Sequence, residues 1–249
     1  KVIGRFDKPE DFYYKDANGN VKPVALPTGC SIGKSGTWLG DYRFADLNGD
    51  GVIDNNDQTF IGNPEPIFTF GFGNTFSWKG WDLSLQFTGS VGNKVLNYNR
   101  RRLEVTGATS NLLTSVLNYA KVEKIDPNGP DDYRNYYVSN ASSTIMPRLY
   151  TESYSNGNNR VSDAFVEDGS YLRLQNVSLS YTFPKKWIEH IFLSNVKLYM
   201  NIQNLFTITK YDGYDPEVGS LWGDALKNGI DYNRYPSPRI YTFGINVSF

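Results

Sequence analysis

The sequence predicts an all-β protein whose strands form an antiparallel transmembrane β-barrel segment with long extracellular loops. Aromatic residues make up 15 % of the 249 residues, and 23 Gly and 12 Pro are distributed among them. Tyr and Phe suit pleated surfaces, whereas Gly and Pro favour turns, so this composition indicates many strands joined by loops. Strict alternation of apolar and polar residues, and connections that alternate between short and long, complete the prediction.

The alternation is clearest in "RIYTFGINVSF" at the C-terminus. Odd-numbered residues from Tyr241 to Phe249 are apolar, and the even-numbered residues between them are Thr, Gly, Asn and Ser. Side chains alternate between the two faces of a strand, so one face is apolar and the other is small and polar. Four upstream segments share the pattern, which predicts strands at 66–78, 80–91, 170–183, 195–207 and 239–249.

Two environments produce this alternation. The apolar face packs on a core in a soluble sandwich, whereas it contacts lipid in an outer-membrane barrel. Aromatic residues gather near the strand ends, and the polar faces carry few Lys and Glu. The connections 79–80 and 184–193 are short, whereas 92–169 and 208–238 are long, which is typical of outer-membrane barrels. Lipid contact is therefore the favoured interpretation, and a secreted β-sandwich that binds carbohydrate and carries a structural calcium is the alternative.

Charge and rare residues exclude other classes. With 25 basic and 26 acidic residues, the chain offers no basic surface for nucleic acid. Cys30 is the single cysteine and His190 the single histidine, which leaves no internal disulfide and little material for a catalytic triad. Glu167 and Asp168 are adjacent on an extended segment and point to opposite faces, which is unsuitable for paired glycosidase carboxylates. We expect that the chain is not an enzyme.

The stretch "DLNGDGVIDNND", residues 46–57, resembles a calcium loop. Oxygen ligands fall at positions 1, 3, 5, 9 and 12, with a backbone carbonyl at position 7 and a glycine, Gly51, at the sharp turn. The predicted ligands of a structural Ca²⁺ are Asp46, Asn48, Asp50, Val52, Asp54 and Asp57. Position 12 is Asp rather than the longer Glu, and the flanks are not helical. A loop of Asx turns without metal is therefore the alternative.

Longer motifs point to a family. "GDYRFADLNGDGVIDNNDQTFIGNPEP", "FTFGFGNTFSWKGWDLSLQFTGSVGNKVLN", "RVSDAFVEDGSYLRLQNVSLSYTFP", "NVKLYMNIQNLFTITKYDGYDPEV" and "PSPRIYTFGINVSF" occur in this order. Together they resemble the C-terminal barrel region of SusC/RagA-type TonB-linked outer-membrane proteins of the Bacteroidota. The resemblance extends over most of the chain from about residue 40 onward.

The resemblance implies a 22-stranded barrel with a plugged lumen. It also implies import of glycans or peptides, energy passed on by TonB through an N-terminal part absent from this sequence, and a SusD-like surface lipoprotein as partner. A periplasmic C-terminus would place residues 1–65, including the 46–57 loop, at the cell surface. Residues 66–249 would then supply the barrel strands, with 92–169 and 208–238 as extracellular loops.

Overall fold

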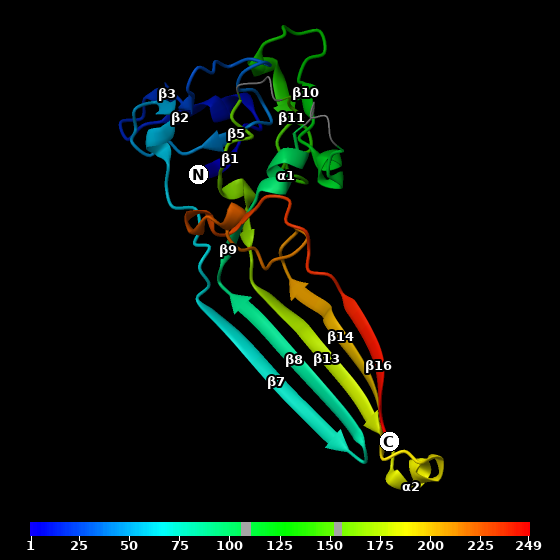
Figure 1. Ribbon diagram of the computed structural model, residues 1–249. Helices are drawn as coiled ribbons and strands as arrows, with labels where there is room; N and C mark the ends of the chain where they lie inside the picture. Colours follow the sequence, from blue (N-terminus) through cyan, green and yellow to red (C-terminus); the bar gives the residue numbers. More distant parts are fainter. Residues whose placement is uncertain (106–110, 152–155) are drawn as a thin grey trace. The chain divides into compact units, whose positions relative to one another are not determined.

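The computed structural model of the protein describes residues 1–105, 111–151 and 156–249 (Figure 1). The chain divides into two compact units. One unit combines residues 1–61 with 97–166, and the other combines 62–96 with 167–249. The two segments predicted as surface loops thus contribute most of one unit, and the five predicted strands lie in the other.

The second unit is built on a five-stranded antiparallel sheet with the order β16-β14-β13-β8-β7, whose strands lie side by side in Figure 1. Its strands are β7 (Phe68–Trp78), β8 (Trp81–Val91), β13 (Tyr171–Thr182), β14 (Asn195–Thr209) and β16 (Ile240–Ser248). Each overlaps one of the five ranges that alternation predicts. The all-β, antiparallel fold class is confirmed.

A two-residue turn joins β7 to β8. Lys79 and Gly80 have φ values of 47° and 88°, the positive values that a hairpin matching the right-handed strand twist requires. A Cβ atom on residue 80 would lie 2.7 Å from the carbonyl oxygen of Thr182. Glycine is therefore needed there both for its backbone conformation and for its lack of a side chain.

Strand register collects the apolar residues into rows across the sheet. The middle row joins Phe76, Leu83, Leu179, Met200 and Phe243, one from each strand. The next row joins Trp78, Trp81, Tyr181, Leu198 and Ile245. Because facing side chains share one side of an antiparallel pair, these rows form one continuous apolar face.

A bulge in β13 explains a change of parity in its sequence. Leu172 and Leu174 are even-numbered, but Val177 and Leu179, farther along the strand, are odd-numbered. Against β8 the register shifts between Leu174 and Asn176, so Gln175 is an extra residue there. Against β14 the shift has the opposite sense, because Asn204 and Leu205 lie opposite Gln175. One inserted residue moves the following side chains to the other face, which keeps the apolar residues of β13 aligned with their neighbours.

Short elements complete the second unit. A small sheet has the order β12-β9-β15, and a short helix follows β13. No helix among the described residues is long and apolar enough to cross a bilayer. These elements are β9 (Lys94–Asn97), β12 (Val166–Asp168), β15 (Ile230–Asp231), α2 (Lys185–Ile188), η6 (Glu189–Ile191), η7 (Leu221–Gly223) and η8 (Ala225–Lys227).

The first unit has short pairs of strands around small cores. The pairs are β1 (Val2–Arg5) with β5 (Tyr42–Phe44), β2 (Tyr13–Lys15) with β3 (Val21–Pro23), β4 (Leu26–Pro27) with β6 (Val52–Ile53), and β10 (Val122–Lys124) with β11 (Tyr136–Val138). The helices are α1 (Tyr98–Leu103), η1 (Pro9–Phe12), η2 (Asn55–Asp57), η3 (Thr114–Asn118), η4 (Tyr133–Asn135) and η5 (Asp163–Phe165). The larger core contains Phe6, Phe12, Trp38, Leu39, Tyr133 and Tyr136.

A buried ion pair holds distant parts of this unit together. Asp41 is fully buried, and its Oδ1 accepts a bond from Arg148 Nε at 2.7 Å and from Asn158 Nδ2 at 2.9 Å. Trp38 N donates to Asp41 Oδ2 at 2.7 Å, and Asn158 Oδ1 accepts from Tyr42 N. Arg148 also donates to the carbonyl oxygens of Lys34 and Gly36, so both charges of this pair have hydrogen-bond partners, the condition under which such a pair is tolerated.

Candidate functional site

The most extensive candidate site is the apolar face of the five-stranded sheet. Phe243 is 72 % exposed, Ile245 61 % and Trp78 68 %, although such side chains normally avoid water. Phe72 and Phe76 of β7 are exposed on the same face. A continuous exposed apolar surface of this kind marks contact with lipid or with another protein surface.

The opposite face of the sheet is small and polar. Its middle row joins Thr75, Ser84, Ser178, Asn201 and Thr242. Asp82 accepts a bond from Ser77 Oγ at 2.6 Å and lies 3.9 Å from Lys197 Nζ. The tyrosine ring of Tyr199 lies over Gly244, where a Cβ atom would be 2.2 Å from the ring. This face therefore suits a hydrated or polar surface rather than hydrocarbon.

The predicted metal loop is closed by its own carboxylates. Asp46 accepts bonds from Gly49 N at 2.7 Å and Gly51 N at 2.9 Å. Asp50 Oδ1 accepts from Val52 N at 2.9 Å, and its Oδ2 accepts from Asn48 Nδ2 at 2.8 Å. These contacts form the Asx turns of the alternative interpretation.

Asp57 joins the two ends of the loop. It is 5 % exposed, and it accepts bonds from Leu47 N at 2.7 Å and Asp54 N at 2.8 Å. Hydrogen bonds from the Asp54 and Leu47 amides lower the pKa of Asp57, since they stabilise the carboxylate. Among the described residues, no three or more His, Cys, Asp or Glu side chains are grouped as they would be around a metal ion. The calcium site therefore stays a prediction.

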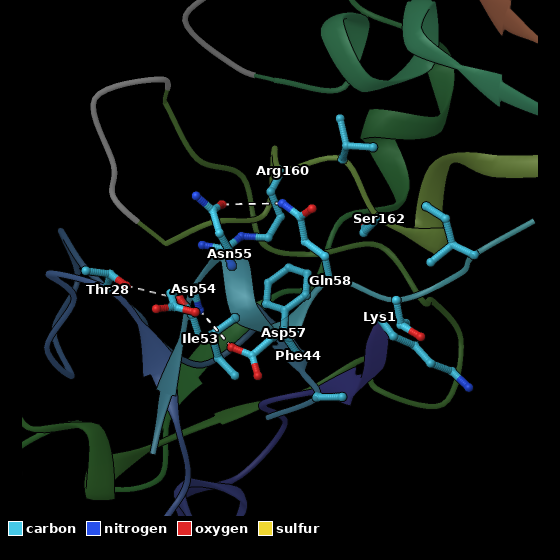
Figure 2. A pocket seen from close by; sticks show the side chains of 14 residues that line it. Lys1, Thr28, Phe44, Ile53, Asp54, Asn55, Asp57, Gln58, Arg160 and Ser162 are labelled. Carbon is cyan, nitrogen blue, oxygen red and sulfur yellow. Dashed lines mark hydrogen bonds between the residues drawn. The ribbon is translucent and has the colours of Figure 1, made fainter. Parts of the chain in front are cut away.

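A pocket of about 780 Å³ with mixed polar and apolar lining lies beside the second half of this loop (Figure 2). Its lining includes Asp54, Asp57, Phe44, Arg160 and Ser162. The guanidinium carbon of Arg160 lies 4.9 Å from the centre of the Phe44 ring, and burial lowers the pKa of this arginine. Arg160 Nε and the 2 %-exposed Ser162 Oγ are buried and have no hydrogen-bond partner among the described residues.

A second ion pair fixes the segment 210–239 to the sheet. Arg173 of β13 is 4 % exposed, and it donates to Asp215, to Glu217 Oε2 at 2.8 Å and to Thr207 Oγ1 at 3.0 Å. Burial favours the neutral acid, but hydrogen bonds from Ser237 N, Glu217 N and Arg173 outweigh it and lower the pKa of Asp215. This cluster ties residues 215, 217 and 237 to β13.

We expect Arg173→Met to loosen the segment 210–239. Losing a hydrogen bond to a charged group costs about 1.5–3 kcal/mol, which corresponds to about tenfold or more in local opening. Hydrogen exchange at the Ser237 and Glu217 amides would report it. Arg239→Met is the matched control, because the Arg239 guanidinium makes one 3.4 Å contact with Asn204 O.

The same cluster predicts a pH dependence. Because the folded-state pKa of Asp215 is lowered, its stabilisation is present above the pKa of the free carboxylate. It is lost as the pH falls through the lowered value. Exchange at the Ser237 and Glu217 amides that stays slow in Arg173→Met would contradict the role of this cluster in holding residues 210–239. An exchange rate of the unsubstituted protein that does not change through this acid range would contradict it as well.

Comparison with known proteins shows which receptors this chain resembles in sequence. The chain is 32 % identical over 242 residues to TonB-dependent receptor P3 of Formosa agariphila, covering 96 % of this chain and 22 % of that receptor. It is 27 % identical over 210 residues to the TonB-dependent receptor SusC of Bacteroides thetaiotaomicron, covering 84 % and 18 %. The sequence is of the SusC/RagA type. No family model matches the chain.

The structures agree with the SusC/RagA assignment at the level of the fold. The chain superposes on the RagAB peptide importer in the open-open state with a TM-score of 0.56 and 19 % identity, covering 99 % of this chain and 24 % of that one. The RagAB peptide transporter gives a TM-score of 0.56 and 21 % identity, with 99 % and 25 % covered. This SusC/RagA-type chain spans about a fifth of the length of the curated relatives it matches.

These findings confirm the SusC/RagA resemblance and the barrel fold class, of which the five strands form an open segment. They leave the ligands of the 46–57 loop as a prediction. Sequence reasoning missed Asp41, Arg148 and Arg173. Arg160 and Ser162 were missed as well, although they lie in or beside the "RVSDAF" motif that carried the resemblance. The ion-pair partners of Asp41, Arg148 and Arg173 are more than 40 residues away in the chain, as is the Phe44 ring beside Arg160, so spacing gives no signal of these contacts.

Proposed function

We propose that this chain is the C-terminal part of a TonB-dependent outer-membrane transporter that imports glycans or peptides. The observation that carries the proposal is the exposed apolar face, which register makes continuous over five strands and which suits hydrocarbon. The named relatives are TonB-dependent receptors, and a structural neighbour is a peptide importer. A soluble sandwich would need this face to be covered.

In this proposal the polar face of the sheet lines part of the lumen. The C-terminus is periplasmic, and the unit of residues 1–61 and 97–166 lies at the cell surface. A SusD-like lipoprotein covers the barrel there, and the TonB system drives uptake from the periplasmic side. The order of short and long connections supports this orientation, since outer-membrane barrels have short periplasmic turns and longer external loops.

Uptake by cells tests the proposal. A strain lacking the full-length receptor should lose uptake of one labelled substrate class, either oligosaccharide or oligopeptide. Restoring the full-length gene should recover uptake only while the proton-motive force is intact. Unchanged uptake of both classes in the deletion strain, with the receptor expressed in the parent, would contradict the importer assignment.

We also propose that the 46–57 loop binds one structural Ca²⁺. The order of oxygen ligands supports it, as do Gly49 and Gly51, whose φ values of 76° and 86° permit the tight turn. Four carboxylates within twelve residues also repel one another unless a cation compensates. Asp46, Asn48, Asp50, Asp54 and Asp57 would supply side-chain oxygens, and Val52 its carbonyl.

Removal of calcium tests the loop separately. Calorimetric titration of Ca²⁺ into the chelator-treated full-length receptor should give a single saturable site, and binding should raise the melting temperature. Asp46→Ala should abolish the heat, whereas Asp16→Ala, in another acidic turn of the same unit, should not. Absence of heat at millimolar Ca²⁺ would leave the loop as a set of Asx turns.

A further inference from the structure

A continuous series of aromatic rings leads from the apolar face of the sheet into the turn that follows β13. Trp81 and Tyr181 have ring centroids 4.7 Å apart, and Tyr181 and Phe183 are 5.1 Å apart in an edge-on arrangement. Phe183 in turn meets Trp187 of α2 at 6.4 Å. The side chain of Trp187 therefore lies on the same side of the sheet as the apolar rows.

The turn itself, residues 184–193, exposes further large apolar side chains. Ile188 is 5 % exposed and anchors α2, whereas Trp187 is 64 %, Ile191 61 % and Phe192 91 % exposed. Trp187 lies in α2, Ile191 is the last residue of η6, and Phe192 follows it directly. In Figure 1, α2 lies beyond the ends of the strands, beside the C-terminus.

The backbone holds Phe192 in this outward position. Its φ is 57°, a left-handed conformation that is unusual for a non-glycine residue and more so for a bulky one. Phe192 N donates to Glu189 O at 3.2 Å, and Leu193 N donates to Ile188 O at 3.4 Å. A strained backbone that presents an exposed aromatic ring suggests a use for that ring.

Positive charge lies beside these apolar groups. Lys185 and Lys186 are exposed, and no carboxylate of the described residues forms an ion pair with either. Glu189 is the one acidic residue of the turn, so two cations face one anion. An apolar side flanked by lysines is the composition of segments that lie in a bilayer interface and attract anionic headgroups.

We propose that the 184–193 turn is an interfacial anchor for the phospholipid leaflet at this edge of the barrel. Trp187, Ile191 and Phe192 insert among the upper acyl chains, and Lys185 and Lys186 contact lipid phosphates. The inference rests on the proposed membrane barrel, because it extends the lipid-contacting face past the strand ends. Continuity with that face and complementary charge favour lipid over a protein partner.

Fluorophore labelling tests the anchor in the full-length receptor. In a background that lacks Cys30 and any other native cysteine, single cysteines at Ile191 and at the adjacent His190 receive an environment-sensitive probe, and Phe243→Cys serves as the reference in the sheet. The receptors are reconstituted in phosphatidylglycerol or phosphatidylcholine vesicles that contain a shallow spin-labelled lipid, or a deep one for position 243. Parallel samples are exposed to iodide as a water-soluble quencher. We expect several-fold stronger quenching at position 191 than at 190. Quenching at 191 should be greater in phosphatidylglycerol, and Lys185→Gln with Lys186→Gln should remove that difference.

The possible results distinguish a failure of the anchor proposal from a failure of the membrane-barrel proposal. If position 243 is quenched by lipid while position 191 is quenched only by a water-soluble agent, the anchor is wrong and the barrel stands. If 191 is shielded from both agents, a protein partner covers the turn and the lipid assignment fails. If 243 is also accessible to water, the membrane barrel itself is wrong.

Discussion

Leu179→Arg should destabilise the full-length receptor by about 2–4 kcal/mol, the cost of an arginine on the lipid face near the bilayer midplane. Leu179 lies in the middle apolar row, with Leu83 and Met200 as its neighbours on the adjacent strands. The guanidinium would have to reach the interface or draw water into the hydrocarbon. Denaturant unfolding from liposomes and the temperature of heat-modifiable gel migration measure the effect.

Ser178→Arg is the matched control, because it places the same side chain one residue away on the polar face. Its neighbours there are Ser84 and Asn201, and the environment is polar. We expect Ser178→Arg to lower the free energy of unfolding by only a small fraction of the decrease that Leu179→Arg causes. An equal loss at both positions, or a larger one at 178, would show that the two faces do not differ as described.

Asp41→Asn should cost about 3–5 kcal/mol in the unit of residues 1–61 and 97–166, since it leaves the buried Arg148 charge without its counter-ion. Asp41 is the common acceptor for Arg148, Trp38 N and two asparagine side chains. Hydrogen exchange at the Trp38 and Tyr42 amides measures the opening of this network in the full-length receptor.

Asp7→Asn is the control for Asp41→Asn. Its carboxylate lies 2.6 Å from Arg5 Nε, but it is 36 % exposed, and Arg5 keeps backbone acceptors at Thr144 and Met146. We expect at most about 1 kcal/mol. Adding Arg148→Met to Asp41→Asn should recover part of the loss, because no unpaired charge then remains buried. A further loss in the double variant would contradict this explanation.

Alternation along single strands was enough to predict the sheet. Five ranges and their apolar faces follow from period two alone, because a strand exposed to lipid on one side cannot change parity without a bulge. The bulge at Gln175 is itself visible in the sequence as the change from "LRL" to "VSLS". Sheet order was not predicted, because alternation does not record which strands pair.

Whether a candidate site could be predicted from the sequence depended on how far apart its residues lie in the chain. The 46–57 loop was found because its residues are consecutive and their spacing has chemical meaning. Asp41 and Arg148 are 107 residues apart, and Arg173 and Asp215 are 42 apart, so their pairing becomes visible only in three dimensions. The sequence predicts residues 1–65 and 92–169 as loops, because the strands in these segments are too short to show alternation.

Spin-label accessibility along β16 tests most directly whether lipid covers the apolar face. Single labels at positions 241 to 247 of the full-length receptor, in liposomes and in a background that lacks Cys30 and any other native cysteine, would be probed with oxygen and with a water-soluble nickel chelate. We predict that collisions with oxygen peak at odd positions, where Tyr241, Phe243, Ile245 and Val247 lie. Odd positions shielded from both reagents would instead show that protein covers this face, and the membrane assignment would be wrong.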